Sequence, residues 1–230
     1  MPRHKSTVAE HNGRGRAISD HLRRYVMAIA FDPDFHVTPA AENPVITSLN
    51  RRQSVPARQL GEPAPGEATL QRMLALASRV PDHGRRVPWR FLRITGEARA
   101  ALGDALVARA LERNPQATAP SLEKDRNRFA SPLVIAVVAR LGPDEKIPES
   151  ERYATACCVC FALLQAAQGF GFGAQWLTGW PAYDAAILQL LGLSADERIA
   201  GFIHIGTAQA EAIERERPDP ATLLTDWTPA

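Results

Sequence analysis

Apolar and polar residues follow regular periods from about residue 45 to the end of the chain. The segment 66–80 has apolar side chains at the i, i+3, i+4, i+7 spacing of an amphipathic helix: Leu70, Met73, Leu74 and Ala77. The Ala- and Leu-rich segment 97–114 predicts a second helix that ends before Pro115. A long, largely apolar helix is expected over 148–169, because proline and acidic residues open this segment and a glycine closes it.

Other segments have the pattern of β-strands. Residues 133–139 are apolar without interruption and rich in β-branched side chains, which predicts a central strand buried on both faces. Shorter apolar segments predict strands at 90–95, 174–178 and 199–206, and 184–191 predicts a short helix. Because helices and strands alternate and no internal repeat occurs, the pattern favours a layered α/β or α+β sandwich.

The composition indicates one globular domain with an appendage. Of the 230 residues, 45% are hydrophobic and 23% charged, and the formal net charge is only +2, which excludes a chain that is disordered throughout. The longest apolar stretches fall short of the roughly 18 residues that a membrane span needs, so we expect no transmembrane helix and no membrane partner.

The charge is distributed unevenly. Residues 1–30 carry six basic and two acidic side chains, so the rest of the chain has a net charge of −2 and is not expected to bind nucleic acid. We expect residues 1–44 to form a flexible N-terminal extension and 45–230 to form the folded domain. The alternatives for the extension are an organelle transit peptide and a later start at Met27. A secretory signal is not expected, because a continuous apolar core is missing.

Three cysteines, Cys157, Cys158 and Cys160, lie within the long predicted helix. Their spacing fits neither a zinc nor an iron–sulfur site, and a disulfide between adjacent cysteines is strained. We therefore expect them to be small buried hydrophobic residues, with no metal bound, in a protein of the reducing cytoplasm.

Glycine-rich and basic segments are candidate binding elements. Gly169, Gly171 and Gly173 follow a helix and precede a strand, which is the reverse of their order in a dinucleotide fingerprint. They indicate a helix C-cap with a tight turn or, alternatively, a close approach of the backbone to a ligand. Arg51 and Arg52 can bind a phosphate together with a nearby hydroxyl, although most such pairs are simply solvated.

The proline-bracketed loop 81–88 contains His83, which can donate a hydrogen bond to a heterocycle or be a loop histidine with a protein partner. The sequence has no nucleophile elbow, P-loop, HExxH motif or pair of catalytic carboxylates, which disfavours hydrolysis and phosphoryl transfer. Phosphate and heterocycle contacts without proton-transfer machinery are typical of cofactor redox chemistry.

A series of motifs over residues 45–227 resembles the nitroreductase family, with the small single-domain branch of YdjA-type NAD(P)H nitroreductases as the best match. The motifs are Arg51-Arg52-Gln53-Ser54-Val55, Gly61-Glu62-Pro63-Ala64-Pro65, Val80-Pro81-Asp82-His83-Gly84, Pro88-Trp89-Arg90-Phe91, Lys146-Ile147-Pro148, Gly173-Ala174-Gln175-Trp176-Leu177-Thr178 and Ile199-Ala200-Gly201-Phe202-Ile203-His204-Ile205-Gly206-Thr207. The resemblance implies an α+β three-layer sandwich with a central, mainly antiparallel sheet flanked by helices. It also implies an intertwined homodimer that binds FMN at the dimer interface.

The resemblance implies cofactor-binding residues as well. Arg51, Arg52 and Ser54 match an Arg-Arg-Ser motif for the FMN phosphate and ribityl chain; Gln53 departs from that motif, so either 51–53 or 52–54 is its counterpart. The other implied contacts are His83, Val87, Trp176, Leu177 and Thr178 to the flavin, Ala166, Ala167, Gln168, Gly169, Phe170 and Gly171 to the nicotinamide cofactor, and Arg215 and Arg217 to the phosphate. Val87 is expected to contribute backbone or packing only.

The implied activity is that of an FMN-dependent oxidoreductase. Hydride passes from NADH or NADPH through flavin N5 to a nitroaromatic, quinone or similar small-molecule acceptor by a ping-pong mechanism, and no catalytic side chain is required. The alternatives are a flavoenzyme of the same fold with dehalogenation, azoline oxidation or flavin fragmentation chemistry, a non-catalytic flavin-binding protein, and a nucleic-acid-associated protein that uses its basic N-terminus. The physiological acceptor and the choice between NADH and NADPH stay open.

Overall fold

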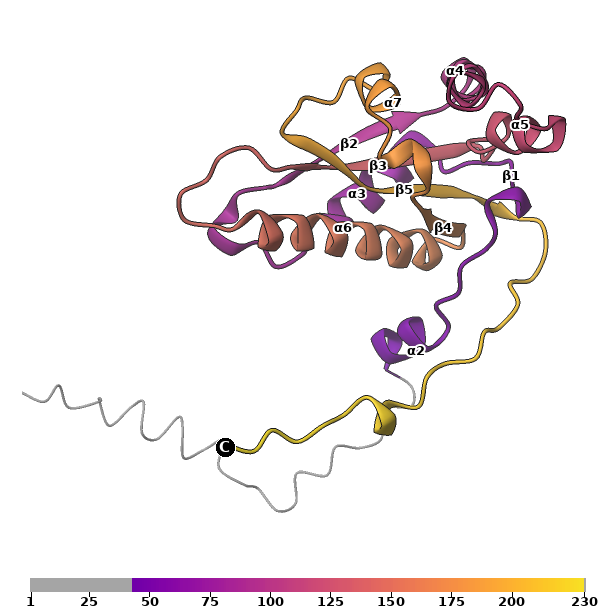
Figure 1. Cartoon of the computed structure of the whole chain (residues 1–230). Coiled ribbons are helices and arrows are strands. Elements are labelled where there is room, and N and C mark those ends of the chain that lie inside the picture. The colour runs from indigo at the N-terminus through magenta and orange to yellow at the C-terminus, as the bar shows by residue number, and fades with distance from the viewer. Residues whose placement is uncertain (1–42, 230) are drawn as a thin grey trace, which may run out of the picture. The chain divides into compact units, whose positions relative to one another are not determined.

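The computed structural model of the chain describes residues 43–229 (Figure 1). The predicted N-terminal extension lies outside the described residues except for its last two positions, and the folded unit begins at Pro44. Within the described part, no helix combines the length and the apolar character that a membrane crossing requires.

A five-stranded antiparallel sheet forms the middle layer. Its strands are β1 (Leu60–Gly61), β2 (Trp89–Ile94), β3 (Leu133–Arg140), β4 (Gly173–Leu177) and β5 (Glu197–Ala208). On one side β5 pairs with β3, which in turn pairs with β2; on its other side β5 pairs with β4 and, further along, with β1. All predicted strands are confirmed with small shifts of their ends, whereas the two-residue β1 was not predicted.

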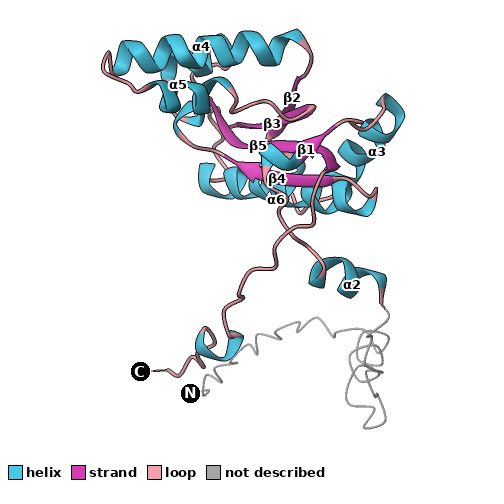
Figure 2. Cartoon of the chain, turned by 90° about the vertical axis from the view of Figure 1, so that its right-hand side faces the viewer, coloured by secondary structure: helices cyan, strands magenta, loops and turns pink. Residues whose placement is uncertain are grey.

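Helices cover both faces of the sheet (Figure 2). One face carries α3 (Glu67–Ala77) and α6 (Glu149–Gly169), and the other carries α4 (Glu97–Arg113), α5 (Ala119–Arg126) and α7 (Ala185–Leu190). The helix α2 (Pro44–Asn50) precedes the sheet. Within residues 43–229, three 3₁₀ helices lie in connections between elements, Ala57–Gln59, His83–Arg85 and Trp180–Ala182, and a fourth, Pro220–Thr222, lies in the C-terminal segment after β5. This three-layer arrangement confirms the predicted α+β class.

The central strand β3 joins two hydrophobic cores. Because side chains alternate along a strand, Leu133, Ile135 and Val137 pack with α3 and α6, while Val134 and Val138 pack with α4 and α7. All of these side chains are buried. The uninterrupted apolar sequence therefore reflects burial on both faces, as the pattern predicted.

The amphipathic pattern of α3 has the expected role. In α3, Leu70, Met73 and Ala77 are buried against the sheet side, whereas Leu74 is half-buried. The cysteines of α6 only partly follow their prediction: Cys160 is buried and Cys157 half-buried, but Cys158 is exposed. All three are free thiols. The exposure of Cys158 arises because α6 presents one side of its surface outward, with Phe161 one turn further along also 42% exposed.

Candidate functional site

Residues 51–54 connect α2 to the sheet. The amides of Arg51 and Arg52 donate the last hydrogen bonds of α2, at 3.0 and 3.3 Å. The amide of Val55 then donates to the carbonyl oxygen of Ala174 in β4 at 3.1 Å, and the Val55 side chain is buried. The two arginines therefore lie on a backbone that is fixed at both ends.

The C-terminal segment returns to residues 51–54 and brings a carboxylate with it. Gln53 Nε2 donates to Glu214 Oε2 at 2.5 Å, and Arg217 Nη2 lies 2.7 Å from Glu214 Oε1. Arg217 also donates to the carbonyl oxygen of Arg52 at 3.3 Å. The hydrogen bond from Gln53 is the main cause of a lowered pKa for Glu214, with Arg217 and Arg52 contributing through their charges. An anion is thus held between Gln53 and Arg217.

Ser54 has a different partner from its neighbour. Its Oγ accepts a hydrogen bond from Arg52 Nη1 at 3.4 Å, while Gln53 contacts the carboxylate. The residue that interrupts the expected Arg-Arg-Ser motif is therefore the one that contacts the anion.

A cavity of about 510 Å³ adjoins this group and shares Gln53 and Arg51 with it. The end of α6, the start of β4 and the beginning of the C-terminal segment form its other walls through residues such as Gln168, Phe172 and Ala174. The cavity wall therefore combines apolar side chains with the guanidinium of Arg51, three side-chain amides (Gln53, Gln168 and Gln209) and the carboxylate of Glu211.

The glycine-rich turn after α6 ends the helix. The amide of Phe172 donates to the carbonyl of Ala167 at 3.0 Å, and that of Gly171 donates to Gln168 at 2.9 Å, which are the paired bonds of a Schellman motif. Gly171 has the positive φ of 83° that this motif requires. The interpretation of the glycines as a helix C-cap and tight turn is confirmed.

The segment expected to meet the nicotinamide cofactor divides into buried and accessible residues. Ala166 and Ala167 are buried in the core at 8% and 0% exposure. Gln168 and Gly171 line the cavity, Gly169 is exposed, and the ring of Phe170 lies beneath a guanidinium of α3 at 5.0 Å. The residues at the end of this segment can therefore contact a ligand in the cavity, whereas the buried side chains of Ala166 and Ala167 cannot.

Trp176, Leu177 and Thr178 lie at the end of β4 and are half-buried. Trp176 Nε1 donates to the carbonyl oxygen of Ala200 in β5 at 3.1 Å. The indole ring occupies the space that a Cβ at Gly201 would need. The glycine in β5 therefore lets the tryptophan lie flat on the neighbouring strand.

The loop before β2 has a fixed backbone. Asp82 accepts hydrogen bonds from the amides of Arg86 and Val87, at 3.1 Å to Oδ1 and 2.8 Å to Oδ2 respectively. The amide of Arg85 donates to the carbonyl oxygen of Asp82 at 3.1 Å. Pro88 and Trp89 are buried where the loop enters the strand.

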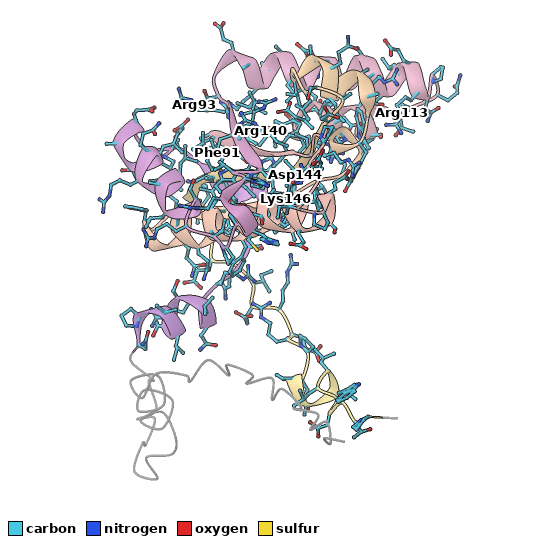
Figure 3. The ribbon with its side chains drawn as sticks, turned by 90° about the vertical axis from the view of Figure 1, so that its left-hand side faces the viewer. Phe91, Arg93, Arg113, Arg140, Asp144 and Lys146 are labelled. Carbon is cyan, nitrogen blue, oxygen red and sulfur yellow. The ribbon has the colours of Figure 1, made fainter. Side chains whose placement is uncertain are left out.

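A histidine–carboxylate hydrogen bond and an ion pair attach this loop to the region around the start of α6. His83 Nδ1 lies 2.7 Å from Glu151 Oε2. Arg86 Nε lies 2.7 Å from Asp144 Oδ2 in the connection between β3 and α6, where Figure 3 shows Asp144 close to Lys146. Hydrogen bonds from the amides of Ile147 and Lys146, followed by the arginine, lower the pKa of Asp144 to about 2. The histidine has a protein partner, as one of its two interpretations expected.

Within one chain the candidate residues form two separate groups. His83 and Val87 lie near the start of α6, whereas residues 51–54, 168–171 and Arg217 lie near its end. Glu151 and Gln168 are seventeen positions apart on this helix, which corresponds to about 25 Å at 1.5 Å per residue. The structure brings together the arginines and the α6 turn, but not the His83 loop.

Sequence reasoning missed the carboxylates that position these residues. Asp82, Asp144, Glu151 and Glu214 each bind a residue that is distant in the sequence or on the opposite side of a turn. The one available signal was the Asp-His-Gly turn at 82–84, because aspartate commonly caps the amides that follow it. The alternating charges at 214–217 gave no indication that Glu214 would contact Gln53.

The sequence comparisons identify the family. The Nitroreductase family profile matches residues 49–207. The chain is 34% identical over 179 residues to the "Putative NAD(P)H nitroreductase YdjA" of Escherichia coli K12, which covers 77% of this chain and 95% of the relative. The chain therefore belongs to the nitroreductase family.

Solved structures show the same fold. A nitroreductase-like family protein from Bacillus cereus superimposes with a TM-score of 0.67 at 25% identity, covering 80% of this chain and 95% of the other. NfnB of a Sphigopyxis strain, described as an FMN- and NADPH-dependent nitroreductase, superimposes with a TM-score of 0.65 at 20% identity, covering 79% and 97% respectively. The protein is thus a nitroreductase-type oxidoreductase by family and has that family's fold.

Proposed function

We propose that this protein is an FMN-dependent oxidoreductase that passes hydride from NADH or NADPH to a nitroaromatic, quinone or similar small acceptor by a ping-pong mechanism. When bound, FMN supplies the atom, flavin N5, that accepts and returns the hydride. The name of the E. coli relative and the description of NfnB support the donor and the cofactor.

The observation that carries this proposal is the anion held between Gln53 and Arg217. The Glu214 carboxylate lies beside two arginines and accepts from Gln53 and Arg217, so these residues fit an oxyanion. A phosphate monoester has the same acceptor chemistry and a larger charge. The residues present therefore fit the FMN phosphate, which would replace Glu214 as their partner.

The other residues of this region bind and orient rather than transfer protons. The cavity beside Gln53 gives space for the body of the cofactor, with the amide of Gln168 and the turn at Gly171 on one wall. Trp176, Leu177 and Thr178 would support the flavin ring, and the turn at 168–171 would meet the nicotinamide coenzyme. Arg51, Arg52 and Arg217 would hold the phosphate, with Arg215 next to them.

We also propose that the site is completed by a second copy of the chain. His83 and Val87 are too far from Arg51 and Arg52 within one protomer to meet the same cofactor. A twofold axis that packs α6 of one protomer antiparallel to α6 of its partner would bring the start of one helix to the end of the other. Each FMN would then meet residues 51–54 of one protomer and the His83 loop of its partner.

The distribution of exposed apolar side chains supports this assembly. The helix α2 has no buried residue, and its Ile46 and Leu49 are 50% and 51% exposed. Such side chains are expected to pack against a partner. The free thiols Cys157, Cys158 and Cys160 fit a reducing compartment, and we place the enzyme in the cytoplasm.

The test begins with the purified full-length protein. We expect a yellow protein with stoichiometric FMN that is bleached by NADH or NADPH under anaerobic conditions and recoloured by a nitroaromatic or a quinone. A colourless protein that takes up no FMN would exclude the proposed function. Bleaching without reoxidation by either acceptor would instead indicate a specialised activity.

The phosphate assignment is tested by the double substitution Arg51→Ala, Arg52→Ala. We expect flavin to be lost during gel filtration, because each charge-assisted hydrogen bond contributes roughly 1.5–3 kcal/mol. Arg58→Ala is the matched control, since Arg58 is exposed in the next turn and is not part of the cavity wall. Unchanged flavin content in the double variant would show that the FMN phosphate binds to other residues of the protein.

A further inference from the structure

The loop between α3 and β2 contains backbone strain. Among residues 43–229, Arg85 and Val87 are the non-glycine residues with positive φ, at 49° each. This region of φ is unfavourable for any side chain and especially for the β-branched valine. Such a backbone conformation is strained and persists only where the surroundings fix it.

The surroundings of the loop fix it from several directions. The carboxylate of Asp82 binds the amides of Arg86 and Val87. The hydrogen bond of His83 to Glu151 and the ion pair of Arg86 with Asp144 attach the loop to the rest of the domain. Gly84, with a φ of 68°, brings the backbone close to the side chain of Ile147. The strained conformation is therefore maintained by contacts on both flanks.

Arg85 is the cation that these contacts leave available. His83 binds Glu151 and Arg86 binds Asp144, whereas the guanidinium of Arg85 has no hydrogen bond or ion pair with another described residue and is exposed. Because the backbone beneath it is held rigid, binding an anion would order only the side chain. A guanidinium on such a support recognises carboxylate or phosphate through two parallel hydrogen bonds.

We propose that the loop presents Arg85 to an oxyanion of the substrate that reacts at the flavin, a role that rests on the proposed FMN site. In that site His83 and Val87, on either side of Arg85, contact the flavin ring, while the FMN phosphate lies at Arg51 and Arg52. Arg85 is thus at the end of the cofactor where substrates approach. The oxyanion is a phosphate of the nicotinamide coenzyme or a carboxylate of the acceptor.

The experiment measures both half-reactions of the full-length, FMN-loaded protein by stopped-flow absorbance. Flavin reduction is followed with NADH and NADPH, and reoxidation with 4-nitrobenzoate and nitrobenzene, which differ by one carboxylate. The variants are Arg85→Gln, which removes the charge, and Arg85→Lys, which keeps the charge but not the forked geometry. Lys124→Gln, an exposed position of α5 on the other side of the sheet, is the matched control for the loss of one positive charge.

We expect Arg85→Gln to lower the second-order rate constant for an oxyanion-bearing substrate by roughly 10- to 100-fold, with a smaller loss in Arg85→Lys. A loss with NADPH alone assigns Arg85 to its additional phosphate, and an equal loss with NADH and NADPH assigns it to the pyrophosphate. A loss with 4-nitrobenzoate but not nitrobenzene assigns it to the acceptor. Flavin content and the Lys124→Gln rates stay at the wild-type level.

Several results would overturn the proposal. These are unchanged rates for all four substrates, an equal loss with nitrobenzene and 4-nitrobenzoate without a loss for the coenzymes, or a loss of FMN itself. Arg85→Gly provides a second test, because glycine adopts a positive φ without strain and preserves the loop; it should reproduce the Arg85→Gln rates. A wild-type protein that binds no FMN would refute the proposed function, and Arg85 would lose its role with it. If the wild type is active and the Arg85 variants have the same rate constants, only the proposed role of Arg85 is refuted.

Discussion

His204 lies in the middle of β5 with 0% of its surface exposed. Its Nδ1 is 3.0 Å from Ser131 Oγ, and its ring is stacked on Phe129 with centroids 5.7 Å apart. Nε2 has no hydrogen-bond partner among the described residues. Burial, and to a smaller extent the charge of Arg128, lowers the pKa of His204 to about 4. The folded protein therefore keeps this imidazole neutral.

The buried histidine predicts a pH-dependent stability. An unfolded histidine takes up a proton below about pH 6.5, whereas His204 in the folded protein does so only near pH 4. The unfolded state therefore binds more protons between these values. The contribution of the neutral His204 to the free energy of unfolding is fully present above pH 6.5. It decreases by on the order of 2–3 kcal/mol as the pH falls towards 4.

Urea unfolding at pH 7.5, 6.0, 5.0 and 4.5 measures this effect, and His204→Gln provides the comparison. The variant is less stable at neutral pH but has no imidazole to protonate. We expect the pH dependence of the two proteins to differ by the His204 contribution. Parallel curves for wild type and variant would show that other groups account for the acid sensitivity.

Residues that belong to a recognisable sequence motif were easier to predict than the residues that contact them in the fold. The resemblance grouped Arg51, Arg52, Gln53 and Arg217, and the structure brings them together. Glu214 was not predicted, because it is 161 positions from Gln53 and the pairing depends on the path of the C-terminal segment. Arg85 was not singled out either, since its importance derives from backbone geometry that no side-chain pattern encodes.

At the scale of secondary-structure elements, the sequence predicted the segments that bury a periodic face. The helices α3 and α4 have a helical period, whereas α6 and the strands β3 and β5 were predicted from largely uninterrupted apolar segments, and all of these elements were found. The short helix α5 was not predicted, because it contains Pro120 and its one buried residue is the charged Asp125. Its position depends on contact with α4 rather than on a hydrophobic stripe of its own.

The contact between α4 and α5 predicts the effect of one substitution. A Cβ at Gly103 of α4 would overlap the backbone carbonyl of Arg126 at the end of α5. The carbonyl oxygen of Arg126, unlike a flexible side chain, cannot turn aside to make room for the new Cβ. Gly103→Ala should therefore force the two helices apart and lower the free energy of unfolding by about 1–3 kcal/mol. Gly169→Ala is the control, since a Cβ there meets no atom within 4 Å at the last position of α6. Chemical denaturation distinguishes the two variants, and equal stability would show that α5 can shift without cost.

At the scale of the whole molecule, one protomer leaves much apolar surface uncovered. The C-terminal segment has four exposed apolar side chains, at 69–86% exposure: Ile213, Leu223, Leu224 and Trp227. Ile46 and Leu49 of α2 are also exposed, at 50% and 51%. Isolated exposed residues are common in soluble proteins, but a series of them in α2 and the C-terminal segment requires another explanation. Hydrophobic periodicity could not predict this surface, because the segment contains no regular element beyond a single 3₁₀ turn.

A second copy of the chain is the partner that we expect to cover this surface. The triple substitution Leu223→Ser, Leu224→Ser, Trp227→Ser removes apolar contacts while it retains Arg217 and Glu214. Burial of a large apolar side chain contributes roughly 1.5–3 kcal/mol, so the dimer should dissociate at least about 100-fold more readily.

Light scattering during gel filtration, at a series of protein concentrations, measures this dissociation, and the flavin absorbance of each peak reports the cofactor. We expect the wild type at twice the chain mass with FMN bound, and the triple variant as a monomer depleted of FMN. Deletion of residues 1–42 is the control: the shortened protein should still have twice the mass of its own chain and the same flavin content per chain. A triple variant that stays dimeric would show that the C-terminal segment is not part of the dimer interface. A monomer that retains FMN would show that residues 51–54 and the adjoining cavity bind the cofactor without the partner's His83 loop.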